Sequence, residues 1–167
     1  MSWFHLWLFL HVTAAIVAFG PTFVFPLIGI AASKEPQHVG FALKLDAAIE
    51  DKLVIPFALT MPVSGIALAV VLSIDWAKNA WLTLGLALYV VALVIAVFVQ
   101  RPIVHRLIHM ADGMRAAPAV AGPGAAAAGP PAEFLRLTAR VRTFGMILTA
   151  LLIAIIVLMV WKPGGNI

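Results

Sequence analysis

Apolar residues gather in four long segments of this chain, at about 3–30, 53–74, 80–99 and 134–161. Three of them contain stretches of about 20 residues or more without a charge, the length of helix that crosses a ~30 Å hydrocarbon core. Continuous runs of this length argue against a β-barrel, whose strands are short and alternate in polarity. The pattern therefore predicts an all-α integral membrane protein, a single four-transmembrane-helix bundle over 1–167.

Two features modify the first two spans. Gly20, Pro21 and Pro26 lie in the second half of span one. Proline removes a backbone donor and clashes with the preceding turn, so we expect a bend or a break there. The polar stretch 34–52 has apolar residues at near-helical spacing, which predicts a short amphipathic helix between spans one and two. This helix either lies at the interface or extends span two outward.

The remaining connections differ in length and composition. The polar turn 75–79 is so short that spans two and three must be antiparallel neighbours. Span three is able to continue as a helix beyond Gln100. The stretch 111–132 is almost entirely Ala, Gly and Pro with little apolar bulk, which is typical of a flexible loop rather than a domain.

Composition supports a membrane location and excludes some chemistry. The chain is 63% hydrophobic and 11% charged, whereas soluble domains carry about 25% charged residues. It has no cysteine, which excludes a disulfide, a thiolate nucleophile and a cysteine metal site. The net charge is +4, but the basic residues flank apolar spans. We therefore expect the lipid bilayer, and further copies of the chain or a larger membrane complex, as partners, and no nucleic acid.

The basic residues also predict orientation. Eleven lysines and arginines are present, and only Lys78 and Lys162 lie outside the two long connections after spans one and three. The positive-inside rule then places both long loops in the cytoplasm and both termini outside, in a bacterial inner membrane. Met1 and Ser2 carry no positive side chain, so we expect no cleavable signal peptide.

One histidine lies at the depth of the hydrocarbon. Counting from Trp3 with a rise of ~1.5 Å per residue, His11 lies about 12 Å into the bilayer, in one layer with Ser64 and Tyr89. The small residues that follow it on the same helical face favour an orientation toward the bundle. These are Ala14, Ala15 and Ala18. A buried neutral imidazole can ligate metal or haem iron or relay protons. The structural alternative is a hydrogen bond to Ser64, Tyr89 or a backbone carbonyl.

Other polar residues give weaker signals. His105 and His109 lie on one helical face, a spacing that can bind metal, but no third ligand is evident, and a cytoplasmic helix end facing phosphates is the favoured interpretation. The Glu50–Asp51 pair is interpreted as a solvated helix start. Three arginines at the start of span four are expected to anchor it at anionic headgroups. They are Arg136, Arg140 and Arg142.

Three of the spans contain short sequence motifs. They are Leu10-His11, Ala14-Ala15, Gly20, Pro62, Ser64-Gly65 and the run 159–164. With these motifs the chain resembles a family of predicted bacterial integral membrane proteins of unknown function, related to copper-resistance protein D and the HemJ-type protoporphyrinogen oxidases. The resemblance to the HemJ-type enzymes implies that His11 is a ligand of haem b. Those enzymes also use a lysine within a later helix, and span three has none.

Three functions remain open at this point. Because no catalytic constellation is visible, we expect a non-enzymatic accessory or assembly subunit. The first alternative is a haem-binding redox protein or HemJ-like oxidase centred on His11; spans two to four contain no second histidine, so bis-histidine ligation is not available. The second alternative is copper or ion transport, in which His11 with Met61 or Met159 would form a soft ligand set.

Overall fold

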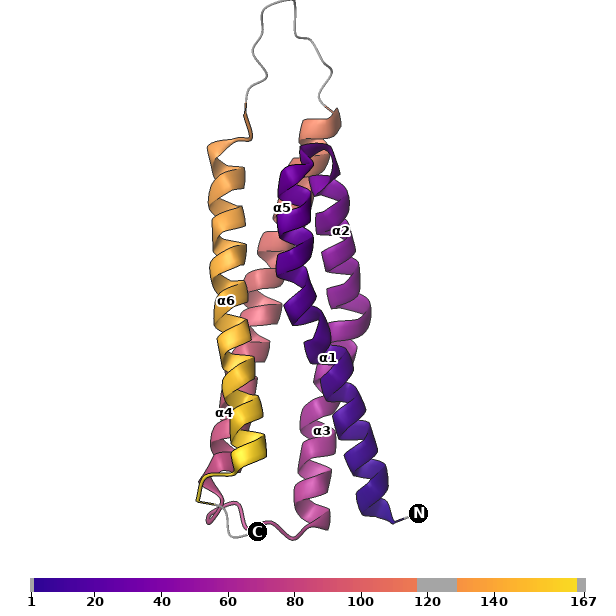
Figure 1. Ribbon diagram of the computed structural model, residues 1–167, viewed down its shortest axis with the longest axis vertical. Coiled ribbons are helices and arrows are strands. Elements are labelled where there is room, and N and C mark those ends of the chain that lie inside the picture. The colour runs from indigo at the N-terminus through magenta and orange to yellow at the C-terminus, as the bar shows by residue number, and fades with distance from the viewer. Residues whose placement is uncertain (1, 117–128, 165–167) are drawn as a thin grey trace, which may run out of the picture.

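The computed structural model describes residues 2–116 and 129–164, and within these ranges it contains helices and no strand. Four helical stretches are long and apolar enough to cross a membrane (Figure 1). They are Trp3–Lys34, Pro36–Val71, Ala80–Ala116 and Ala132–Trp161. The all-α fold with four membrane-spanning helices is thus confirmed.

Helix α1, Trp3–Lys34, forms the first span and contains both Pro21 and Pro26. It bends about midway along its length without interruption (Figure 1). Each proline removes one hydrogen bond, while the other bonds of the helix remain, so the predicted bend occurs and a break does not.

The second span is one long rod made of several segments. A short 3₁₀ turn, Pro36–His38, leads into α2, Val39–Ile49, which continues through the π-helical segment η2, Glu50–Val54, into α3, Ile55–Val71. The predicted amphipathic helix is α2, and it extends span two outward instead of lying flat. No helix-breaking residue separates α2 from α3 before Pro56, which explains the continuity.

The third span has the same construction. Helix α4, Ala80–Val94, passes through the π-helical segment η3, Ile95–Gln100, into α5, Arg101–Ala116. The predicted continuation beyond Gln100 therefore occurs. It also means that 111–116 is helical and not part of the expected loop, while 117–128 of that loop lies outside the described residues. Helix α6, Ala132–Trp161, completes the bundle.

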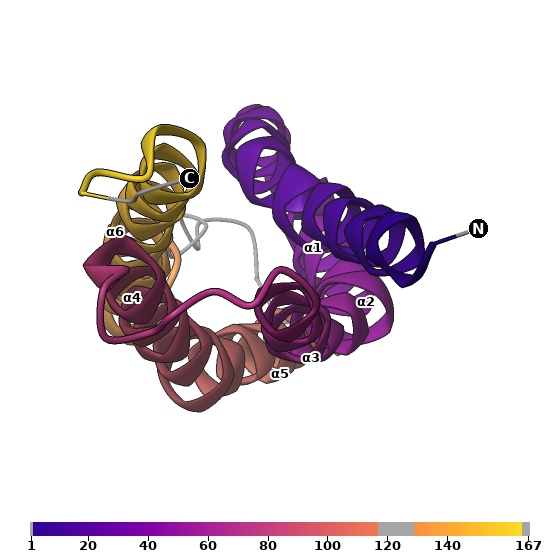
Figure 2. The same ribbon diagram turned by 90° about the horizontal axis from the view of Figure 1, so that it is seen from below.

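The helices associate mainly in two antiparallel pairs (Figure 2). Helix α1 packs most extensively on α3 and α4 packs on α6, while α2 and α5 join the pairs at the loop end. The chain ends and the α3–α4 turn lie at the opposite end (Figure 1). One buried cluster lies between the pairs, formed by Ala14, Met61, Tyr89 and Ile155. A second lies nearer the loop end, formed by Leu107, Phe134 and Leu137.

Candidate functional site

His11 on α1 contacts Ser64 on α3, as the depth argument predicts. The Nδ1 atom of His11 lies 3.0 Å from the Ser64 Oγ. The Ser64 hydroxyl also lies within hydrogen-bonding distance of the Thr60 and Met61 carbonyl oxygens, at 3.0 and 3.1 Å. When its single proton is donated to a carbonyl, the Nδ1–H of His11 must donate to Oγ. This arrangement leaves the Nε2 atom of His11 as an acceptor with a free lone pair.

A glycine makes this contact feasible. A Cβ placed on Gly65 would lie 3.1 Å from the Cε1 atom of His11, closer than ordinary van der Waals contact. The face of α1 that continues from His11 is also buried, since Ala14 and Ala18 are 3% and 1% exposed. The small-residue face thus turns toward the bundle as predicted, and α1 and α3 approach closely along it.

Tyr89 occupies a different position from the one predicted. Its hydroxyl donates a hydrogen bond to the Ala58 carbonyl oxygen, six residues before Ser64 on α3, about 9 Å along the axis at the helical rise. Its ring packs with Ala14 and Met61 in the buried cluster. The structure brings His11 and Ser64 together, and Tyr89 bonds to the same helix at another level.

The candidate metal ligands lie in different parts of the structure. Met61 is buried in the cluster that contains Tyr89, and Met159 packs against the same cluster. Within the described ranges no group of three or more His, Cys, Asp or Glu side chains is placed to hold a metal ion. His105 faces Asp51 at 3.8 Å. Of the two methionines that the copper hypothesis names, Met61 therefore lies about one turn from Ser64 on α3, and Met159 reaches the same cluster from α6.

The interpretation of the Glu50–Asp51 pair as a solvated helix start is wrong for Glu50. Glu50 is 9% exposed, and it forms no hydrogen bond or ion pair with any residue that the structure describes. Asp51, by contrast, accepts a hydrogen bond from the Arg101 Nε at 2.8 Å. A sequence signal for this burial exists, because Glu50 follows Ala42 and Ala47 on the buried face of α2.

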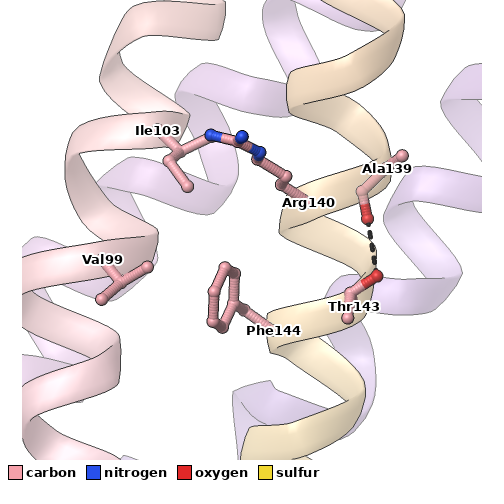
Figure 3. Close-up of a pocket in the computed structure, with 6 residues that line it drawn as sticks. All are labelled: Val99, Ile103, Ala139, Arg140, Thr143 and Phe144. Carbon is pink, nitrogen blue, oxygen red and sulfur yellow. Dashed lines mark hydrogen bonds between the residues drawn. The ribbon is translucent and has the colours of Figure 1, made fainter.

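A groove that the sequence did not suggest lies between η3–α5 and α6 (Figure 3). Its volume is about 500 Å³. The side chain of Arg140 extends from α6 toward Ile103, and the Phe144 ring and Val99 lie below it (Figure 3). Residues that line it are Val99, Ile103, Ala139, Arg140, Thr143 and Phe144. Of these, only Arg140 is charged.

Comparison with known proteins gives one match. A family model described as "Predicted integral membrane protein (DUF2269)" matches residues 5–163. No curated protein and no solved structure matches the chain. The expected relation to copper-resistance protein D and to the HemJ-type oxidases stays a prediction.

Proposed function

Since the chain belongs to the DUF2269 family of predicted integral membrane proteins, we propose that it is a non-enzymatic assembly subunit of a bacterial inner membrane. In this proposal, helix α1 docks against helix α1 of a second copy of the chain. A single observation carries it, a regular stripe of exposed residues along α1.

The stripe follows a seven-residue repeat. Phe9, Ile16, Phe23 and Ile30 are spaced by seven, and Gly20 and Leu27 lie four residues after Ile16 and Phe23. All six residues are exposed. Such a repeat keeps one helix face against a partner helix over several turns. No atom lies within 4 Å of a Cβ built on Gly20, which leaves room for a partner backbone.

The His11–Ser64 contact has a structural part in this proposal. His11, Ala14 and Ala18 lie on the face of α1 opposite the stripe, at 100° per residue. Their packing on α3 fixes the rotation of α1. The stripe is thereby held outward along the whole helix. A lipid-facing surface needs only apolar side chains, whereas a regular repeat with a glycine suits another helix.

The natural absence of cysteine makes the docking surface directly testable. Phe23 and Val24 are 49% and 46% exposed, but only Phe23 belongs to the stripe. Oxidising native membranes should give a disulfide-linked dimer for Phe23→Cys and little for Val24→Cys. Equal cross-linking of both variants, or of neither, would contradict docking of this face on a second copy. A linked product with a heavier, different protein would place α1 in a larger complex instead.

Haem b binding at His11 is the second candidate function, and the position of the Ser64 hydroxyl favours it. Histidines that ligate metals usually donate their other ring N–H to a neighbouring oxygen, and His11 has this arrangement through Nδ1 when Ser64 donates its proton to the Thr60 carbonyl oxygen. The Nε2 lone pair is suited to ligate haem iron. Haem bound there would supply one-electron chemistry. Ser64 and Gly65 would orient the ring. The groove between η3–α5 and α6 does not include His11, so the fit of haem to this chain rests on the ligand and its orientation alone.

The visible absorption spectrum of the purified protein separates these candidates. Haem binding predicts a Soret band that His11→Ala removes and His5→Ala retains, because His5 lies exposed near the start of α1. Colourless, folded protein from a haem-replete host would exclude the haem candidate and leave the assembly proposal intact. Metal analysis of the same sample tests the copper alternative.

A further inference from the structure

The groove between η3–α5 and α6 crosses the boundary of the hydrocarbon. The uncharged run of α6 extends from Thr143 to Trp161, and the uncharged part of the third span ends at Gln100. Phe144 and Val99 therefore lie on the apolar side of this boundary, and Arg140, one turn further out, lies on the polar side. The groove is apolar at one end and cationic at the other, along the direction of α6 (Figure 3).

Arg140, like Arg136 and Arg142 on the same helix, differs in its partners from Arg101 and Arg106 on α5. Arg101 donates to Asp51 and Arg106 donates to Glu133. Arg140 makes no ion pair or hydrogen bond with the residues described. The stretch 117–128, which connects α5 to α6, contains no acidic residue. The groove therefore carries one uncompensated positive charge beside an apolar wall.

The geometry points to a binding site for one anionic phospholipid of the surrounding membrane. Its phosphate would lie against the Arg140 guanidinium, whose planar donors match phosphate oxygens. The first part of an acyl chain would lie against Val99, Ile103 and Phe144. Basic pockets between membrane helices are known to bind anionic headgroups, and a volume of about 500 Å³ suits part of a single lipid. The Thr143 hydroxyl donates to the Ala139 carbonyl oxygen at 3.0 Å, so its proton is already used.

Native mass spectrometry of the full chain with phosphatidylglycerol or phosphatidylcholine tests this site. We expect preferential retention of one phosphatidylglycerol, and about fivefold weaker binding in Arg140→Gln. Arg136→Gln is the matched control, since it removes the same charge one turn away on α6 and does not line the groove. It should bind phosphatidylglycerol like the natural chain.

A second variant keeps the charge and removes the space. Val99→Trp fills the apolar end of the groove from another helix, and it should also weaken phosphatidylglycerol binding. Equal loss in Arg136→Gln and Arg140→Gln would overturn the site in favour of diffuse attraction to the helix end. Retention independent of headgroup charge, or full binding by Val99→Trp, would overturn it as well. Helix content by circular dichroism confirms that each variant is folded.

Discussion

A histidine inside a bilayer is costly unless its ring nitrogens have partners. His11 obtains one partner from Ser64, and the absence of a side chain on Gly65 lets the imidazole reach it. At the scale of single residues, the contact depends on three residues from two helices: His11 on α1, and Ser64 and Gly65 on α3. This dependence makes Gly65 a sensitive position, although glycine inside a helix is otherwise unfavourable.

Gly65→Ala should lower the thermal stability of the protein in detergent. The added methyl group would lie 3.1 Å from the imidazole, and shifting the ring away from Ser64 should cost about 1 kcal/mol or more. Gly145→Ala is the control, because no atom lies within 4 Å of its added Cβ. In α6 this change should be neutral or stabilising by up to about 1 kcal/mol. Thermal unfolding followed by circular dichroism measures both, and equal shifts would contradict a tight contact at Gly65.

At the scale of helices, each π-helical segment ends two residues before a proline. Segment η2 precedes Pro56 and η3 precedes Pro102. A wider turn accommodates the missing donor and the clash that proline brings to the preceding turn. It also changes which side chains face inward. In η2, Glu50 turns into the bundle while Asp51 reaches Arg101 on the third span.

The two adjacent carboxylates should therefore respond oppositely to neutralisation. At about pH 8, Glu50→Gln should raise the melting temperature, because it removes a buried charge that lacks a hydrogen-bonding partner. Asp51→Asn should lower the stability by about 0.5–1 kcal/mol, since it weakens a partly exposed pair with Arg101. The melting temperatures of the two variants measure this difference. A loss of stability in Glu50→Gln would mean that its carboxylate has a stabilising partner.

At the scale of the whole molecule, the start of α1 and the end of α6 share one end of the bundle, and the turn from α1 to α2, the end of α5 and the start of α6 share the other (Figure 1). Most basic residues lie at the loop end, while Lys78 and Lys162 lie at the end with the termini. The even number of membrane-spanning helices requires this arrangement of the termini. The charge asymmetry then predicts which end faces the cytoplasm.

A reporter that is active only outside the cytoplasm should work when fused to the C-terminus. Alkaline phosphatase fused after Ile167 should be active in a bacterial host. The same reporter fused after Ala116, in the connection between α5 and α6, should be inactive, because the basic end is retained in the cytoplasm. The reverse pattern of activities would invert the proposed orientation and leave the fold unchanged.

Much of the fold could be predicted from the sequence. The apolar runs predicted the four spans, and the short turn before Ala80 predicted that spans two and three are antiparallel neighbours. These two spans pack on each other through α2 and α5, whereas α3 packs mainly on α1 and α4 on α6. The contact between His11 and Ser64 followed from depth and from the small residues beside His11. The position of Tyr89, the burial of Glu50 and the groove at Arg140 could not be predicted in this way. Each depends on how far one helix is rotated and shifted against another.

The sequence by itself determined that four helices cross a membrane, because the transfer of each side chain into hydrocarbon contributes nearly independently of its neighbours. Only the tertiary structure decided which polar groups meet. A helix turns by 100° and rises 1.5 Å per residue. A shift of one residue along a helix, or one π-helical turn, therefore changes which side chain on a neighbouring helix a given residue contacts. For this reason Ser64 and not Tyr89 lies against His11, and Glu50 is buried while the adjacent Asp51 pairs with Arg101.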